Sequence, residues 1–266
     1  MKVCPIASGS SGNCIYAGDD NTHILLDAGI SRKRMVDGLQ SIGVAPEELS
    51  GICITHEHSD HISGLEVFIK KYHTPVYATA GTIAYIRERK PELVDSEEFI
   101  VIEAEETFSI GELQIKAFAT SHDAAEPVGY TVQGSGGRLG LVTDLGYYDE
   151  YIVSHLKECE ILILESNHDI SMLQAGRYPY QLKKRILGEA GHLSNTSAGD
   201  LLCQLIHDKL RYVYLAHLSE ENNYPDLAFE TVRCQLQMNQ PNHGVHFKMA
   251  VAKRKEPSPM VDLCEA

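Results

Sequence analysis

Short apolar runs alternate with amphipathic stretches along most of the chain, and this pattern predicts alternating β-strands and α-helices in an α/β protein. Strands of the buried type are expected at GICIT (51–55), EILILES (160–166) and RYVYLAHL (211–218). Ser31 can cap a helix that carries Met35, Leu39 and Ile42 on one face and ends at Gly43. A hairpin is expected to turn at Gly111, before LQIKAFATS (113–121).

The domain organisation is expected to be simple. The 266 residues, 43% of them hydrophobic, suffice for a large core, and no linker interrupts them. Each half runs from strand-rich to mixed strand and helix, which favours a core of two similar halves facing each other. We therefore predict one domain over residues 1–252. The polar, proline-containing residues 253–266 are expected to form a disordered tail.

The strongest chemical signal is the segment His56-Glu57-His58-Ser59-Asp60-His61, which directly follows a buried-type strand. In an extended segment His56 and His58 point to the same side, so both imidazoles can bind one metal ion. Asp60 and His61 then fall in the first turn of the next helix and indicate a second, adjacent metal ion. A solvated polar loop would rarely hold three imidazoles and a carboxylate within six residues.

Two metal ions need more ligands than one segment supplies, and three further candidates each follow a predicted strand. His122 follows IKAFATS, Asp144 follows RLGLVT, and His217 follows RYVYLA. The two oxygens of a carboxylate such as Asp144 can bridge two cations. A single histidine or aspartate at a strand end is more often structural, but together these three complete the ligand set.

The pattern HxHxDH, followed by a histidine, an aspartate and a histidine after successive strands, resembles the metallo-β-lactamase superfamily from Asp27 to His217. The resemblance implies an αββα four-layer sandwich with the metal site along one edge of two sheets. It also implies that Asp27 supports the HxHxDH loop through hydrogen bonds without binding metal. The implied cofactors are two divalent metal ions, and Zn, Mn and Fe all suit the ligand types.

Further segments resemble the YycJ/WalJ family, which is related to the ribonuclease Z-type nucleases. They are SGSSGNC (8–14), HDAAEPVGYTV (122–132), GHLSN (191–195) and HLSEENN (217–223). Members of that family are regarded as 5′-to-3′ DNA exonucleases. The likeness to ribonuclease Z makes His192 a candidate to contact the scissile phosphate or leaving oxygen, whereas from sequence alone it could be a polar residue beside a helix N-terminus.

The opening turn is a second candidate site, for phosphate. Backbone amides in such a small-residue turn could form an anion-binding concavity, although a plain hairpin turn explains the same residues. The turn consists of Ser8, Gly9, Ser10, Ser11, Gly12 and Asn13. Basic residues also cluster at 32–34 and among 177–185, where they could flank a phosphate path or simply be solvated.

Charge and cysteine content indicate which binding partners and which cellular compartment to expect. A net charge of −14 disfavours binding to polyanions unless metal ions or local cations offset it. We expect DNA as partner, contacted through its backbone and ends, with neither a membrane nor an organic cofactor involved. Seven scattered cysteines and the lack of an apolar leader favour the cytoplasm. The sequence does not fix the oligomeric state.

The resulting hypothesis is a two-metal phosphodiesterase in which a metal-bridging hydroxide attacks phosphorus. Asp60 orients the hydroxide and accepts its proton, and His192 assists the leaving group. The alternative is a glyoxalase II-like thioesterase or lactonase, which could use the same ligands. An iron-based electron-transfer protein is less favoured because no flavin domain is predicted. A binding protein with a vestigial site is disfavoured by the complete ligand set.

Overall fold

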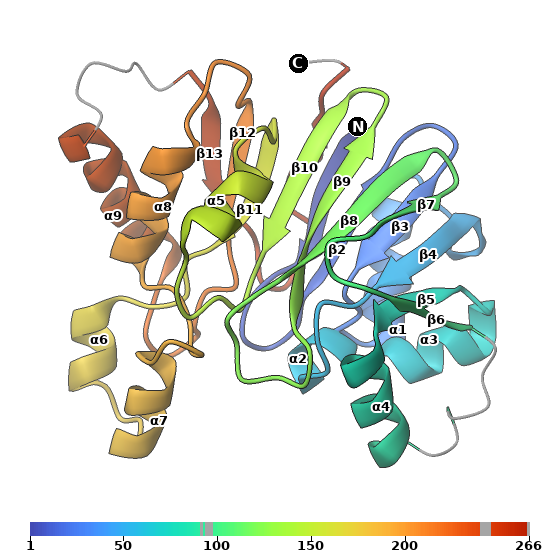
Figure 1. Cartoon of the computed structure of the whole chain (residues 1–266), viewed down its shortest axis with the longest axis horizontal. Helices are drawn as coiled ribbons and strands as arrows, with labels where there is room; N and C mark the ends of the chain where they lie inside the picture. Colours follow the sequence, from blue (N-terminus) through green and yellow to red (C-terminus); the bar gives the residue numbers. More distant parts are fainter. Residues whose placement is uncertain (91–92, 94–97, 240–245, 265–266) are drawn as a thin grey trace. The chain divides into compact units, whose positions relative to one another are not determined.

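The computed structural model describes residues 1–90, 93, 98–239 and 246–264. Its contacts divide the chain into two compact units, whose elements are labelled in Figure 1. Unit 1 contains residues 1–119, 124–137 and 253–266, and unit 2 contains residues 120–123 and 138–252. The expectation of a single domain over residues 1–252 stays a prediction.

Unit 1 is built on a mixed sheet with strand order β14-β1-β2-β3-β4-β5-β6. Its strands are β1 (Lys2–Ala7), β2 (Cys14–Gly18), β3 (His23–Leu26), β4 (Leu49–Cys53), β5 (Val76–Thr79), β6 (Phe99–Ile102) and β14 (Val261–Asp262). Pairing is antiparallel from β14 to β3 and parallel from β3 to β6. The parallel arrangement brings the ends of β3 and β4 to one edge, where Asp27 and the HxHxDH segment follow.

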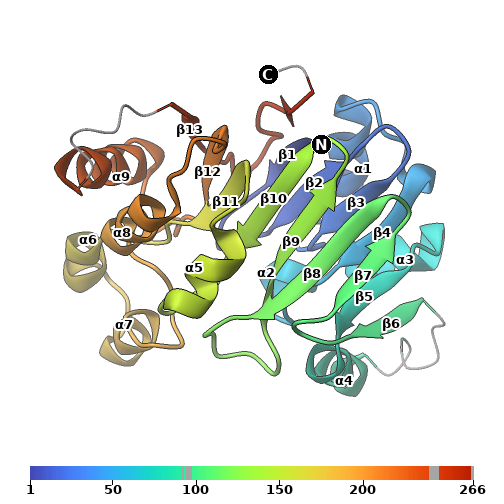
Figure 2. The ribbon, with the colours of Figure 1, turned by 45° about the horizontal axis from the view of Figure 1, so that its top comes forward.

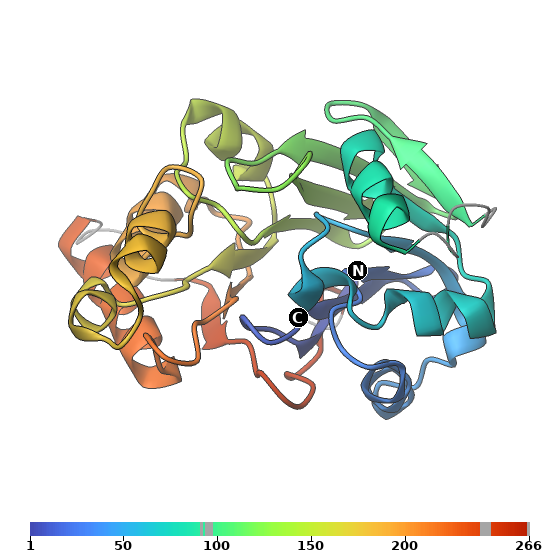
Figure 3. The same cartoon turned by 90° about the horizontal axis from the view of Figure 1, so that it is seen from below.

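The helices of unit 1 occupy the connections between these strands, as the blue to teal ribbons of Figure 3 show. They are α1 (Arg32–Ser41), the 3-10 turn η1 (Pro46–Glu48), α2 (Ser59–Ile62), α3 (Leu65–Tyr72) and α4 (Ala80–Arg89). The expected cap of α1 is confirmed, because the Ser31 side chain accepts a hydrogen bond from Arg34 N. Met35 and Leu39 on α1 join Phe68 of α3 in one buried cluster with strand residues such as Ile52. Burial of these apolar faces holds the helices on the sheet.

Three antiparallel strands complete the regular structure of unit 1: β7 (Thr107–Ile110), β8 (Leu113–Ala119) and β9 (Val128–Gly134). The hairpin between β7 and β8 turns at Gly111, whose φ of 54° suits glycine. This confirms the predicted turn. Tyr130 on β9 donates a hydrogen bond to Ile54 O across 2.7 Å, so β9 is joined to the backbone just after β4.

Unit 2 contains the parallel strands β10 (Gly137–Val142), β11 (Ile161–Glu165), β12 (Tyr212–Ala216) and β13 (Lys248–Val251), which Figure 2 shows as neighbours. Its helices are α5 (Glu150–Leu156), α6 (Ile170–Ala175), α7 (Tyr180–Ile186), α8 (Asn195–Leu205) and α9 (Pro225–Asn239). Helices α8 and α9 pack against each other through buried residues that include Leu202 and Val232. All five residues of β11 are buried, in agreement with the continuous apolar run that predicted this strand.

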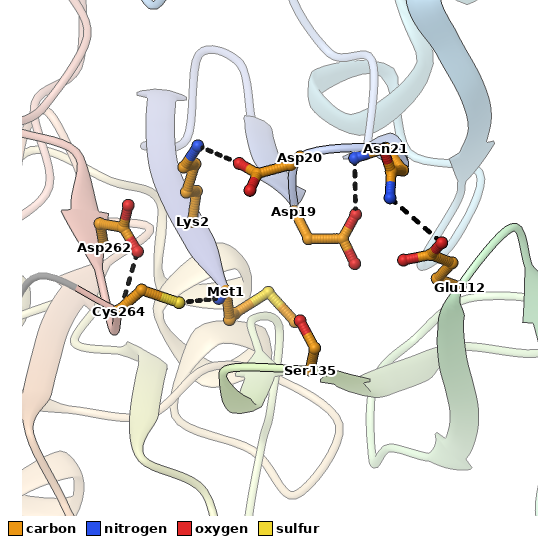
Figure 4. Close-up of a pocket in the computed structure, with 9 residues that line it drawn as sticks. All are labelled: Met1, Lys2, Asp19, Asp20, Asn21, Glu112, Ser135, Asp262 and Cys264. Carbon is orange, nitrogen blue, oxygen red and sulfur yellow. Dashed lines mark hydrogen bonds and ion pairs between the residues drawn. The ribbon is translucent and has the colours of Figure 1, made fainter.

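The C-terminal residues differ from the prediction of a disordered tail. Val261 of β14 pairs with Val3 of β1, and Leu263 N donates to Met1 O. Figure 4 shows this end of unit 1, where Cys264 N donates to the Asp262 carboxylate. Burial of Val261 and Leu263 compensates for ordering the segment. The prediction is therefore wrong for residues 253–264, while residues 265–266 lie outside the described part.

Candidate metal centre

The predicted ligands of unit 1 cluster where β4 ends. The His56 ring lies 4.1 Å from that of His61 and 4.6 Å from that of His58, measured between centroids. Asp60 stands beside them, with Oδ2 at 3.5 Å from His61 Nε2. His58 is the N-cap of α2, so the extended chain turns into a helix within the motif. Three imidazoles this close would repel one another if protonated, and they are typical ligands of divalent metals.

Asp27 supports this loop in the way that the resemblance implies. It is fully buried, and its Oδ1 accepts a hydrogen bond of 2.8 Å from Thr55 N. Its Oδ2 lies 2.7 Å from His61 Nδ1. A proton on Nδ1 leaves the lone pair of His61 on Nε2, which can accept the Asn13 amide at 3.2 Å or bind a metal ion. The carboxylate thus sets the orientation and the tautomer of the imidazole.

The backbone of the motif is fixed by two neighbouring segments. Asn13 N donates to Asp60 O over 2.8 Å, and Ala28 N donates to His61 O over the same distance. At Gly29 a Cβ atom would lie 1.6 Å from Asp60 O, so only glycine permits this approach. From β9, Val128 N donates to Thr55 O. The loop is therefore held from several sides before any metal binds.

Most backbone amides of the Ser8–Asn13 turn already donate to acceptors in the protein. Gly9 N donates to Asn13 Oδ1, Gly12 N donates to Gly9 O, and Ser8 N donates to Lys253 O. With Asn13 N bound to Asp60, four of the six amides have protein acceptors, which reduces the case for an anion-binding concavity. A basic residue that the sequence did not indicate lies beside the turn: Arg254 Nη1 is 3.3 Å from Ser11 Oγ. Phosphate binding at this turn stays a prediction.

Unit 2 brings together its own predicted residues around Asp144. Asp144 Oδ1 lies 3.6 Å from His122 Nε2, 3.6 Å from His217 Nδ1 and 3.5 Å from His192 Nδ1. His122 Nδ1 also contacts Gly191 O at 3.0 Å, which leaves its Nε2 turned toward Asp144. Asp144, His122 and His217 are buried, and the His192 side chain is 18% exposed. The expectation that strand ends assemble these side chains agrees with the geometry of this unit.

Backbone conformation marks the same positions. Asp27, Asp144 and His217 each follow a strand and adopt left-handed φ values of 64°, 57° and 55°. For residues other than glycine this conformation costs about 1–3 kcal/mol and persists only where the surroundings impose it. In the described part of the chain, His73 and Glu105 are the other non-glycine residues with positive φ, so three of five are predicted site residues, which supports a functional reason for the strain there.

Glu165 is a site residue that sequence reasoning missed. Its Oε1 lies 2.9 Å from Nδ1 of both His192 and His217. Its Oε2 accepts the amides of Leu145 and Leu193 at 2.8 and 3.1 Å. The available signal was a charged residue at the end of a fully buried apolar strand, which requires partners.

Electrostatics in unit 2 depends on these carboxylates. Burial would raise the pKa of Glu165, but the charge of His192 and the hydrogen bonds from His192 and His217 lower it to about 2. Burial would lower the pKa of His192, yet Glu165 and Asp144 raise it above its ordinary value. Burial dominates at His122, whose pKa is lowered. Glu165 is thus ionised, and His192 is the imidazole of this group most able to carry a proton.

The donor types of unit 2 fit a divalent metal ion. In unit 2, ligand-type atoms of Asp144, Glu165, His192 and His217 lie within 4.8 Å of one another. Both Glu165 oxygens already accept hydrogen bonds, so Asp144 is the better carboxylate ligand and Glu165 the better positioning group. Imidazole and carboxylate together suit Zn, Mn and Fe.

Comparisons with known proteins show the family of the chain. The family model described as "Beta-lactamase superfamily domain" matches residues 22–218. Exodeoxyribonuclease YycJ of Bacillus anthracis is 39% identical over 84% of both chains. Exodeoxyribonuclease WalJ of Streptococcus pneumoniae is 35% identical over 99% of this chain and 98% of its own.

A solved structure supports the expected fold. The metallo-beta-lactamase fold protein YhfI of Bacillus subtilis superposes with a TM-score of 0.70 at 16% identity, covering 97% of this chain and 98% of its own. The expected metallo-β-lactamase fold is thereby confirmed. None of the helices in the described part of the chain is both long and apolar enough to span a membrane.

Proposed function

The chain belongs to the beta-lactamase superfamily and, within it, to the family of the YycJ and WalJ exodeoxyribonucleases, and we propose that it degrades DNA as a 5′-to-3′ exonuclease. Membership of this family makes it a metal-dependent hydrolase. The observation that carries the proposal is the 35% identity over 99% of the chain to a protein named exodeoxyribonuclease. The names of the relatives favour a nuclease over a thioesterase or lactonase.

The metal ligands of the proposal come from both units. They are His56, His58, Asp60, His61, His122, Asp144 and His217. These residues would hold two divalent ions, each Zn, Mn or Fe. Asp27 and Glu165 act as positioning residues, because each holds the Nδ1 atom of a proposed ligand at hydrogen-bond distance. When bound, such ions lower the pKa of coordinated water and polarise a phosphate group.

Two side chains would move protons. Asp60 is partly exposed, with 23% of its side chain accessible, so it can accept a proton from the attacking water. His192 can donate one to the departing oxygen, because neighbouring carboxylates raise its pKa and its side chain reaches solvent. DNA binds through its backbone and ends, and local cations must offset the net charge of −14.

The test uses purified, metal-replete protein and end-labelled duplex DNA and RNA. We expect mononucleotides to be released from the 5′ end of DNA, with no release after chelation or in the Asp60→Ala variant. The His192→Ala variant should be slower by about 10²- to 10⁴-fold, the usual contribution of a general acid, with unchanged metal content. No cleavage of DNA with Zn, Mn or Fe would refute the proposed function. Full activity of His192→Ala would refute only its role.

A further inference from the structure

A pocket of unit 1 adjoins the proposed metal ligands. Its volume is about 540 Å³, within the range of about 300–1,000 Å³ that is usual for ligand pockets. Its lining includes His58 and Arg89, which lies in the last turn of α4. Ile62 of α2 and the residues Tyr85 and Ile86 of α4 line it as well. The pocket is thus shared by a proposed metal ligand and the residues of one helix.

The lining of this pocket suits a flat aromatic group. The Arg89 guanidinium lies over the Tyr85 ring, with its carbon 4.4 Å from the ring centroid. Tyr85 is half-buried, Arg89 is exposed, and both residues line the pocket. Ile62 and Ile86 add apolar surface. Aromatic rings and guanidinium planes are the surfaces on which proteins stack unpaired nucleobases.

The pocket lining carries both signs of charge. Glu57, beside His58, is buried, and its carboxylate accepts hydrogen bonds from Ala125 N at 2.7 Å and from Thr82 Oγ1 at 3.4 Å. A phosphate would be repelled beside Glu57, whereas an uncharged base would not. Lys90 is paired with Glu66 over 2.9 Å, so Arg89 is the lining cation that can attract the sugar-phosphate backbone.

We propose that this pocket receives the nucleobase of a nucleotide flanking the scissile phosphate and holds it by stacking on Tyr85 and Arg89. The inference rests on the proposed function, which places the scissile phosphate near His58. Stacking accepts every base, so the pocket fixes how far the strand advances without reading its sequence.

A purely structural explanation of Arg89 is the preference for cations near a helix C-terminus. That role would change the stability of α4 but would not distinguish a strand with a base from one without it. The experiment therefore compares bases at defined positions and includes a measurement that needs no catalysis.

Single-stranded DNA carrying 2-aminopurine at the first, second or sixth nucleotide from the 5′ end is titrated with chelated, full-length protein. We expect fluorescence quenching at the first or second position and much less at the sixth. Tyr85→Ala and Arg89→Ala should lose most of this difference. Tyr180→Ala, which removes a 75% exposed tyrosine of α7, should retain it. Equal quenching at all positions, no quenching, or unchanged quenching in both pocket variants would overturn the inference.

Cleavage assays separate this inference from the proposed function. With wild-type protein, an abasic nucleotide at the quenched position should raise KM by about tenfold, within the usual range for loss of one stacked base. With the Tyr85→Ala variant, the KM for the abasic strand should be close to the KM for the intact strand. If wild type cleaves DNA but the base makes no difference, the pocket inference fails alone. Thermal melts of both variants check that α4 remains folded.

Discussion

At the scale of single residues, Glu165 is the group on which the imidazoles of unit 2 depend. The groups around its carboxylate are the Nδ1 atoms of His192 and His217 and two backbone amides. When Nε2 of an imidazole binds metal, Nδ1 carries the proton, so every neighbour is a donor. Glu165→Gln replaces an acceptor oxygen with an NH₂ group, which cannot accept the hydrogen bonds of these donors. The imidazoles then lose their orienting partner, and metal affinity should fall by about 10- to 100-fold.

Metal affinity in competition with a chelating dye measures this effect. Glu160→Gln is a control in the same unit, because its carboxylate accepts the Arg138 amide away from the imidazoles. We also expect Glu165→Gln to lower the free energy of unfolding by about 1–3 kcal/mol, the cost of an unsatisfied buried donor. An affinity equal to that of wild type would show that Glu165 does not orient the ligands.

The predictability of the site differed from residue to residue for physical reasons. His56 and His58 were recognisable because ligand type, spacing and strand position coincide in one segment. Glu165 was not, since its role comes from two histidines 27 and 52 positions away in the chain. Arg254 was missed because a polar, proline-containing segment gives no sign that it will pack beside residues 9–11.

At the scale of elements, the close approach of two backbone segments at Gly29 positions the proposed metal-binding loop of unit 1. A Cβ atom there would meet Asp60 O at 1.6 Å, and backbone cannot move aside as a flexible side chain can. Gly29→Ala should therefore displace α2, weaken metal binding and destabilise the protein by about 1–3 kcal/mol or more. Thermal unfolding and metal titration measure both effects.

Gly188→Ala is the matched control, because its added Cβ would meet carbonyl oxygens no closer than 3.3 Å. It should bind metal like wild type. If Gly29→Ala also behaved like wild type, the segment around residue 29 would not constrain the loop, and the position of Asp60 would need another explanation.

The edge strand β14 is an element that the sequence did not reveal. Two residues are too short for an alternating pattern to be recognised, and the neighbouring prolines favour an irregular segment. Val261 is nevertheless buried against unit 1, so Val261→Ala should lower the free energy of unfolding by about 1–2 kcal/mol at about 0.8 kcal/mol per buried CH₂. Urea denaturation tests this against Met260→Ala, whose side chain is 42% exposed. Equal effects would mean that β14 contributes no stability.

At the scale of the whole molecule, the fold class was predictable because apolar runs of strand length alternate with helical patterns. The composition of the two units was not, since unit 1 takes residues from three separate stretches of the chain. Contacts such as the hydrogen bond from Ser8 N to Lys253 O join the first and the last of these stretches. Periodicity reports on neighbours in sequence and carries no information about such distant pairs.

If the proposed metal ions take ligands from both units, metal removal should lower the stability of both units. Cys53 in unit 1 and Cys159 in unit 2 are buried, and burial raises the pKa of Cys159 to about 12 and that of Cys53 well above its ordinary value. Both thiols should therefore react only after local or global unfolding. Metal at 100 times its Kd stabilises the native state by about 2.7 kcal/mol, so chelation should speed alkylation of both thiols by up to about 100-fold.

The exposed Cys234 and Cys264 serve as internal controls, because their alkylation does not require unfolding and should be insensitive to chelation. Mass spectrometry of labelled peptides at successive times gives all four rates in one experiment. Acceleration at Cys159 alone would place the metal ions in unit 2, and acceleration at Cys53 alone would place them in unit 1. Either result would contradict a shared centre, because a ligand bound by both units must protect both against unfolding.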